Sequence, residues 1–334
     1  VDMKINIRKS HGFSLVELLI AMVVGLVIIS GAFSLHSSTR KTQTINEAQM
    51  DMIADARFAI EMISYDLRHA GMWGGTNKSS LISCKSSDAA CSASPADESL
   101  PAAITGDCAA GWYYDLTRPV FATDGSAAVK PYSGTCLSAS EGLVGSADIL
   151  EIRYADSNAT DTAALLDNQA NVRSNAINGR LFVGDTQPII DAYDASSLTG
   201  NHELHAYVYY ISNYTDAAGD GVPSLRRVAL INGPAIQNQT LVSGVSDLQV
   251  QFGIDTGTDE IIDRYVDPDA VTNWSKVYAA KIWLLMRSNE KQKGVDTTKT
   301  FSIAGAAAKN YGGVGDYRYF LVTSVVNLRN MKQI

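Results

Sequence analysis

The sequence contains few cysteine, histidine, proline and charged residues. Its 334 residues include four cysteines, five histidines and eight prolines, and only 19% are charged. So few cysteines exclude a disulfide-dense scaffold, and the lack of a C-x-x-C pair argues against a zinc site. The first proline is Pro95, so no proline interrupts a helix in the first 94 residues.

Common catalytic and nucleic-acid-binding patterns are absent as well. The sequence has no G-x-S-x-G elbow and no glycine followed by lysine, which a P-loop requires. It carries 27 Lys and Arg against 35 Asp and Glu, a net charge of −8. Binding to phosphate backbones needs positive charge, so the net charge argues against a general nucleic-acid binder. We expect no enzyme activity and no cofactor.

A long apolar run is present near the amino terminus. Residues 1–12 carry Lys4, Arg8 and Lys9 against Asp2, and 17 of the next 23 residues, 13–35, are apolar. As a helix this run is about 35 Å long, enough to cross a bilayer. A secretory signal cleaved near Ala32-Phe33-Ser34 would have a shorter apolar run, and a plain anchor would not explain the charge of Glu17.

A third interpretation accounts for both the length of the apolar run and the charge of Glu17. The string Gly12-Phe13-Ser14-Leu15-Val16-Glu17 resembles the leader of type IV prepilins and pseudopilins. The resemblance implies cleavage by a prepilin peptidase between Gly12 and Phe13, N-methylation of Phe13, and retention of the apolar helix. It also implies that Glu17 pairs with the amino terminus of a neighbouring subunit, because a partnered charge costs much less in an apolar medium.

The helix is expected to continue to residue 70. Apolar and small residues recur at helical spacing over 36–70, and Gly71, Gly74 and Gly75 are stop signals. The whole helix, 13–70, would be about 87 Å long. We expect a membrane or filament-core half at 13–35, an amphipathic half at 36–70, and a periplasmic β-rich head at 71–334.

All four cysteines lie in the region 76–147, which is rich in serine, alanine and glycine. An exported chain meets an oxidising compartment, so disulfides are expected. Three connectivities are open. Short loops close most easily, which favours Cys84–Cys91 and Cys108–Cys136 over the alternatives.

Six segments rich in β-branched and aromatic residues predict strands in the head. One long helix followed by serial strands predicts an α+β fold, with the helix packed against an antiparallel sheet. The segments are 148–155, 204–212, 225–231, 247–254, 277–287 and 319–328.

Several short stretches of the head resemble PilW-type minor pilins, with a weaker likeness to GspJ-type pseudopilins. These stretches are 65–71 (YDLRHAG), 209–211 (YYI), 223–227 (PSLRR), 241–253 (LVSGVSDLQVQFG) and 325–330 (VVNLRN). The resemblance implies a type IV pilin-like fold and a non-catalytic subunit.

Other candidate sites have weaker support. His202 and His205 lack the spacing of a zinc helix, so we expect exposed strand-edge histidines. Two acidic loops are weak calcium candidates through Asp216, Asp220, Asp255 and Asp259. Without the leader the chain has 24 basic and 34 acidic residues, which opposes direct nucleic-acid binding. Arg226-Arg227 is expected at a solvated strand edge.

The resemblance implies a minor pilin that primes type IV pilus assembly and sits at or near the tip. Its implied partners are other minor pilins and the major pilin through the helix, the prepilin peptidase, the inner-membrane assembly platform, lipid, and a PilY-type tip adhesin. It would wait in the inner membrane with a periplasmic head. The alternatives are a pseudopilin of a type II secretion system and a membrane-tethered periplasmic enzyme.

Overall fold

The structure is a computed structural model, and the chain divides into two compact units, Val1–Asp51 and Met52–Ile334. It describes residues 14–83, 112–125, 132, 137, 139–190, 198–233, 235–257, 259–292, 300–304, 309–310 and 316–332.

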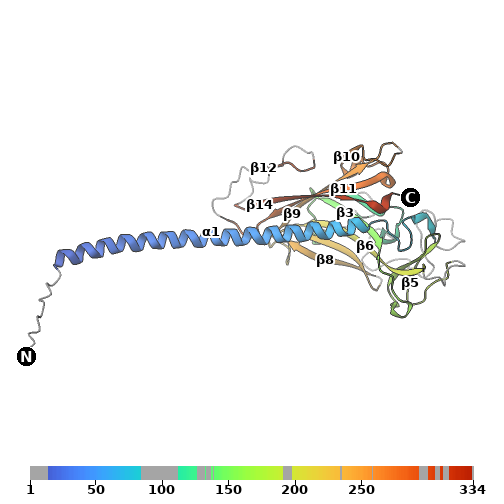
Figure 1. Ribbon diagram of the computed structural model, residues 1–334, viewed down its shortest axis with the longest axis horizontal. Coiled ribbons are helices and arrows are strands. Elements are labelled where there is room, and N and C mark those ends of the chain that lie inside the picture. The colour runs from blue at the N-terminus through green and yellow to red at the C-terminus, as the bar shows by residue number, and fades with distance from the viewer. Residues whose placement is uncertain are drawn as a thin grey trace, which may run out of the picture. The chain divides into compact units, whose positions relative to one another are not determined.

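One continuous helix, α1 (Leu15–His69), runs from the first unit into the second (Figure 1). It confirms the predicted helix to within two residues at each end. The helix stops at Gly71, whose φ of +79° is readily adopted by glycine. The Gly71 N–H then donates to the Arg153 carbonyl at 3.1 Å, so the chain passes directly from the helix onto the sheet.

The larger sheet has eight strands in the order β1-β5-β4-β6-β3-β2, with β7 beside β6 and β8 beside β7. All pairs are antiparallel except β1–β5. The strands are β1 (Ile82–Ser83), β2 (Val120–Asp124), β3 (Asp148–Ala155), β4 (Ala170–Ser174), β5 (Gly179–Val183), β6 (Gly200–Ser212), β7 (Ser224–Ile231) and β8 (Ala235–Ser243).

The second sheet has four antiparallel strands in the order β10-β9-β11-β14, and β12 pairs with β13 separately. These strands are β9 (Val245–Ile254), β10 (Arg264–Val266), β11 (Val277–Arg287), β12 (Thr300–Phe301), β13 (Lys309–Asn310) and β14 (Tyr319–Asn327). Short 3₁₀ helices occupy Ser79–Leu81, Trp112–Tyr114, Ala139–Glu141, Thr162–Ala164, Pro268–Ala270, Trp274–Lys276 and Arg329–Met331.

The six predicted strands are all present, but the head contains two main sheets where one was expected. The prediction missed β2, β4, β5 and β8 among others. β4 reads ANVRS and β8 reads AIQNQTLVS, so neither has the apolar alternation on which strand prediction depends. Both are fixed by their neighbours, since β4 lies between β5 and β6 and β8 pairs with β7.

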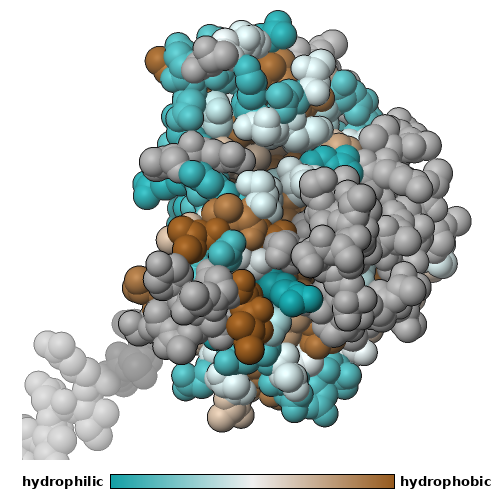
Figure 2. Space-filling model, turned by 90° about the vertical axis from the view of Figure 1, so that its right-hand side faces the viewer, coloured by the Kyte–Doolittle hydropathy of each residue, from teal (hydrophilic) through white to brown (hydrophobic). Residues whose placement is uncertain are grey.

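The main core lies between the head part of α1 and the two sheets. The helix buries one face at helical spacing, starting at Met52 and continuing through Ala56, Ala59, Ile63 and Leu67. A second apolar cluster covers the opposite face of the eight-stranded sheet. Figure 2 shows that hydrophobic residues also gather in the middle of the face turned to the right in Figure 1.

A buried carboxylate joins α1 to the larger sheet. Asp66 is only 4% exposed, and both of its oxygens accept hydrogen bonds from tyrosines. The Tyr154 hydroxyl on β3 donates to Oδ1 at 2.8 Å, and the Tyr209 hydroxyl on β6 donates to Oδ2. Burial raises the pKa of Asp66, and the two tyrosine hydrogen bonds oppose that rise. The YDLRHAG stretch at the helix end therefore contains the residue that anchors the helix.

A buried ion pair lies on the other face of β3. Glu151 and Arg153 are both fully buried, and Arg153 Nη2 donates to Glu151 Oε2 at 2.6 Å. Arg153 also donates from Nε to the Trp112 carbonyl at 2.5 Å and from Nη1 to the Arg118 carbonyl at 2.8 Å. The Tyr132 N–H donates to Glu151 Oε1 at 2.7 Å. One ion pair therefore fastens three points of the chain between β1 and β3 onto the sheet.

Replacing Asp66 with alanine would leave two buried tyrosine hydroxyls without their acceptor. We expect Asp66→Ala to lower the free energy of unfolding by about 2–4 kcal/mol, and Asp66→Asn to lower it less, because its amide can still accept one hydrogen bond. Chemical unfolding of the full chain in detergent measures this. Asp51→Ala, at an exposed helical position, is the matched control. Equal stabilities for Asp66→Ala and Asp51→Ala would contradict the role of Asp66.

Glu151 makes stability depend on pH in a defined direction. Burial raises its pKa from 4.5 to about 7, against the opposing effects of Arg153 and the Tyr132 N–H. The folded state therefore binds this proton more tightly than the unfolded state. The resulting stability is fully present below pH 4.5 and is lost as the pH rises through 7.

We expect Glu151→Gln to remove up to about 3 kcal/mol of this pH dependence. Unfolding free energies measured from pH 4.5 to 8 should fall more steeply for the wild type than for the variant. Glu47→Gln, at an exposed position on α1, should run parallel to the wild type. A constant difference between Glu151→Gln and wild type over this range would refute the assignment.

Candidate assembly site

The first turn of α1 contains a reciprocal cap. Glu17 Oε2 accepts the Ser14 N–H at 3.0 Å, and Ser14 Oγ accepts the Val16 N–H at 3.3 Å. This S-x-x-E arrangement resembles a capping box, in which the serine and the glutamate satisfy N–H groups that the helix leaves unpaired. The spacing of Ser14 and Glu17 in the sequence is the signal for this cap, which was not among the predictions. The predicted cleavage residues, Gly12 and Phe13, lie outside the described residues.

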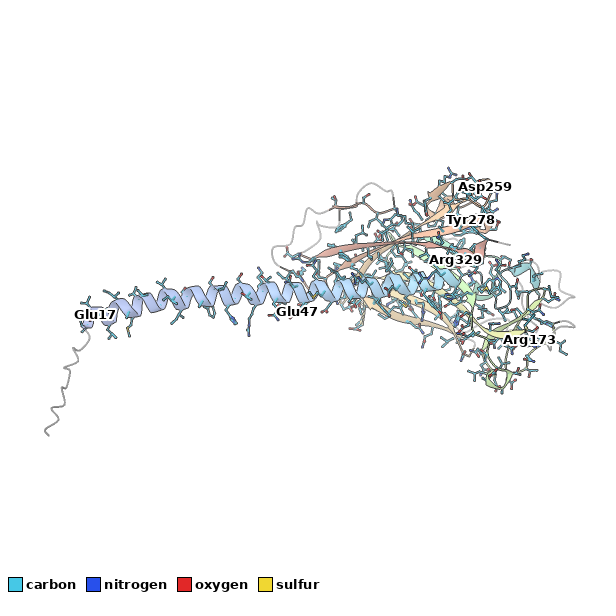
Figure 3. The ribbon with its side chains drawn as sticks, viewed as in Figure 1. Glu17, Glu47, Arg173, Asp259, Tyr278 and Arg329 are labelled. Atoms are coloured by element: carbon cyan, nitrogen blue, oxygen red, sulfur yellow. The ribbon has the colours of Figure 1, made fainter. Side chains whose placement is uncertain are left out.

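Glu17 lies at the beginning of the apolar part of α1 (Figure 3). α1 is the one helix among the described residues that is long and apolar enough to span a membrane. Its large apolar side chains from Leu15 to Leu35 are 51% to 76% exposed. Such a surface needs lipid or other apolar helices around it. The exposed large apolar side chains of this part of α1 are Leu15, Val16, Leu18, Leu19, Ile20, Met22, Val23, Val24, Leu26, Val27, Ile28, Ile29, Phe33 and Leu35.

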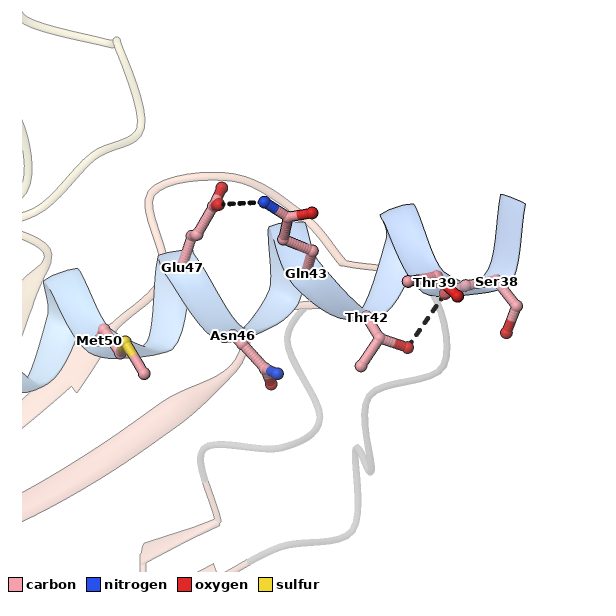
Figure 4. Close-up of a pocket in the computed structure, with 7 residues that line it drawn as sticks. All are labelled: Ser38, Thr39, Thr42, Gln43, Asn46, Glu47 and Met50. Atoms are coloured by element: carbon pink, nitrogen blue, oxygen red, sulfur yellow. Dashed lines mark hydrogen bonds between the residues drawn. The ribbon is translucent and has the colours of Figure 1, made fainter. Parts of the chain in front are cut away.

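The next part of α1 is polar without a break in the helix. Thr42 Oγ1 donates to the Ser38 carbonyl at 3.0 Å, and Gln43 Nε2 donates to Glu47 Oε1 at 2.9 Å (Figure 4). Thr39 Oγ1 donates to the Leu35 carbonyl at 2.9 Å in the same way. These side chains satisfy their hydrogen bonds within the helix, so this stretch is suited to water or to polar surfaces of other subunits.

The cysteines Cys84, Cys91, Cys108 and Cys136 lie outside the described residues, so their pairing stays a prediction. Trp112 and Tyr132 lie four residues inward from Cys108 and Cys136 in the sequence. Their rings contact each other with centroids 5.2 Å apart, and both backbones are held by the Glu151–Arg153 pair.

The acidic loops use their carboxylates to hold their own turns. Asp220 accepts hydrogen bonds from the N–H groups of Val222, Asp216, Thr215 and Ala217, which lower its pKa to about 2. In the same way Asp255 accepts from Gly257 and Glu260, and Asp259 accepts from Ile261. Asp216 lies in the Asp220 turn. Within the described part of the chain, no three His, Cys, Asp or Glu side chains gather as a metal site.

The prediction of exposed strand-edge positions is wrong for the histidines His202 and His205 and for the arginines Arg226 and Arg227. His202 and Arg226 are not at exposed edges: they are 7% and 8% exposed, because β6 and β7 are interior strands. His202 Nδ1 lies 2.8 Å from the Asp156 carbonyl, and its burial lowers its pKa. The guanidinium of Arg226 stacks on Tyr214 at 4.3 Å.

His205 and Arg227 lie in the same two interior strands, β6 and β7. His205 contacts Tyr207, and the guanidinium of Arg227 stacks on Tyr207 at 4.1 Å. Arg226 and Arg227 were predicted to be solvated because β8 was not predicted. The pairing of β8 with β7 makes β7 an interior strand instead of an edge strand.

Comparison with known proteins gives two family matches. Residues 208–330 match the family Type IV Pilus-assembly protein W, and residues 7–33 match the Prokaryotic N-terminal methylation motif. No curated protein and no solved structure matches the chain. The first match runs from the second half of β6 to the closing 3₁₀ helix, and the second includes the predicted cleavage site and Glu17.

The segments between the two matches, 34–207, contain the four cysteines and strands β1 to β5. Both matches agree with the resemblance found in the sequence, and the membrane-length helix and β-rich head agree with a pilin-like fold. Residues 208–330 are therefore similar to the PilW family of type IV pilus-assembly proteins, and the amino-terminal segment is similar to a prepilin leader that continues into a helix long and apolar enough to span a membrane.

Proposed function

We propose that this protein is a minor pilin that helps to prime type IV pilus assembly and is incorporated at or near the pilus tip. The observation that carries this proposal is the combination of a methylation motif and an exposed apolar helix with a head that matches the PilW family over residues 208–330. Pilin-like subunits are structural, and the chemistry of this chain suits that role, because its apolar helix can pack beside those of other subunits.

The proposal assigns roles to Gly12, Phe13 and Glu17. The prepilin peptidase cleaves between Gly12 and Phe13, and Phe13 becomes the N-methylated first residue. Glu17 then lies four residues from a positive amino terminus. One Glu17 oxygen accepts the Ser14 N–H, which leaves the carboxylate able to pair with the amino terminus of a neighbouring subunit. In an apolar surrounding that partner offsets much of the cost of the charge.

The proposed partners follow from the division of the chain. Residues 13–35 lie in the inner membrane and later beside the helices of the major pilin and other minor pilins, while 36–70 and the head at 71–334 lie in the periplasm. The assembly platform of the inner membrane extracts the subunit, and a PilY-type adhesin sits above it at the tip. The match to a pilus-assembly family favours this function over that of a secretion pseudopilin.

Loss of the Glu17 charge should block incorporation into the filament. In a strain that depends on this chain, we expect Glu17→Ala to reduce surface pili by about tenfold or more, because removal of one partner of an ion pair in an apolar medium costs more than about 1.4 kcal/mol. Electron microscopy counts the pili. Glu47→Ala, at an exposed helical position, is the matched control. Normal pili with Glu17→Ala, at equal membrane levels of both variants, would refute the assembly role.

The mature amino terminus should be N-methylated Phe13. Mass spectrometry of the chain purified from a strain with an active prepilin peptidase should show a loss of residues 1–12 and the gain of one methyl group. A start near Leu35 would instead indicate a secretory signal. An intact leader in such a strain would contradict processing by the peptidase, and with it the assignment of Glu17 as the fifth mature residue.

A further inference from the structure

The head contains five N-x-S/T sequences (sequons), the pattern that accepts N-linked sugars in exported proteins. An acceptor asparagine has to lie on the surface with an amide that the fold does not use, because an enzyme must reach its nitrogen. One of the five, Asn158-Ala159-Thr160, also has an acid, Asp156, two positions before its asparagine. The five asparagines are Asn77, Asn158, Asn213, Asn238 and Asn273.

Two of the other sequons are closed by hydrogen bonds to distant parts of the chain. Asn77 Nδ2 donates to the Lys332 carbonyl at 2.7 Å, and Asn238 Nδ2 donates to the Tyr210 hydroxyl at 2.5 Å. Both asparagines are also half-buried. Their amide nitrogens are therefore occupied as long as the head is folded.

Two further sequons are exposed, but the hydroxyl that completes each motif is already bonded. Asn273 Oδ1 accepts both the N–H and the hydroxyl of Ser275, at 3.0 and 2.7 Å, so this sequon bonds to itself. In the Asn213 sequon, the Thr215 hydroxyl donates to the Val222 carbonyl at 2.8 Å. Neither turn offers both of the side chains that the motif requires.

The Asn158 sequon differs from these four. Asn158 and Ala159 are exposed in the loop that follows β3, and among the described residues neither the Asn158 side chain nor the Thr160 hydroxyl has a hydrogen bond. The backbone holds this loop instead. Asp156 Oδ1 accepts the Asn158 N–H at 2.9 Å, and the Thr160 N–H donates to the Asn201 carbonyl at 2.7 Å. Both side chains of the motif are thus available to an enzyme.

Asp156 adds a negative charge beside the acceptor. Its side chain is 39% exposed, and its Oδ2 lies 3.9 Å from His205 Nε2. A carboxylate at this position can form a charge-assisted contact with a basic group of an enzyme. This acid distinguishes Asn158 from the exposed Asn213, which has Ile211 at the corresponding position.

We propose that Asn158 is N-glycosylated in the periplasm by an oligosaccharyltransferase, with a polyprenyl-diphosphate-linked oligosaccharide as the sugar donor. A bond forms between Asn158 Nδ2 and the anomeric carbon of the first sugar, and the bond from that carbon to the diphosphate oxygen breaks. The lipid diphosphate leaves with the electron pair, and the amide gives one proton to a base of the transferase. This inference rests on the export of the head, which is part of the proposed function.

A glycan at Asn158 keeps the surrounding surface of the head in water, because an oligosaccharide is bulky and solubilising. The loop 156–169, which connects β3 to β4, then faces solvent in the assembled filament. Neighbouring subunits therefore contact the head on other surfaces.

The test uses the chain purified from the membrane of the strain in which it occurs. Mass spectrometry of the intact chain and of the peptide containing Asn158 should show a mass increment of one or more sugar residues. Asn158→Gln and Thr160→Val should both lose the increment, whereas Thr160→Ser should keep it, because the motif accepts either hydroxyl. Asn213→Gln, in an exposed sequon without the acid, is the matched control and should keep the increment.

Asp156→Asn tests the acid separately, since its amide oxygen can still accept the Asn158 N–H. We expect this variant to lower the glycosylated fraction by about twofold or more, because the charge-assisted contact with the enzyme is lost. An unchanged fraction would contradict the role given to Asp156. Thermal unfolding confirms that each variant is folded.

An unmodified Asn158, or an increment that survives Thr160→Val, would overturn the inference. Either result would leave the proposed function standing, because that function is read from the pili of the Glu17 variants.

Discussion

The buried contact of Asp66 with Tyr154 and Tyr209 is the interaction on which the head depends. It places a carboxylate of the helix between two strands of the larger sheet, where loss of solvent is offset by two hydrogen bonds. The small residues Ala56 and Ala59 allow the helix to approach the sheets closely, and Ala70 and Gly71 turn the chain onto β3. Tyr209 lies inside the family-matched region and Asp66 lies outside it, so the contact joins two otherwise separate parts of the sequence.

Successive parts of α1 are suited to different surroundings, the first to an apolar medium and the second to the core of the head. Its first part exposes mostly apolar side chains together with one carboxylate and the serines Ser30 and Ser34, and its second part buries a narrow apolar face in the head. No proline interrupts the change, and the threonines after Leu35 bond to their own helix. The chain therefore combines an anchor and a core element in one piece of regular secondary structure.

The helix and six strands could be predicted because their patterns are periodic and their stop signals are strong. β8 could not, because an amide-rich strand is stabilised by its partner and not by its own apolar face. Missing β8 made Arg227 look solvated, although it stacks on Tyr207. Likewise, Glu151 and Arg153 appear in the sequence as the polar half of an alternating strand. Only the segment around Trp112 and Tyr132, packed over that face, makes them a buried pair.

β6 is thirteen residues long, and the family-matched region begins at Val208, in its second half. Residues 200–203 of β6 pair with β4, in the part of the head that lies before that region, residues 204–209 pair with β3, and residues 207–212 pair with β7. A tensile force applied to the β4–β5 part of the head would therefore reach the core along one strand. It would load many hydrogen bonds in shear at once, an arrangement that resists mechanical rupture better than bonds opened one after another.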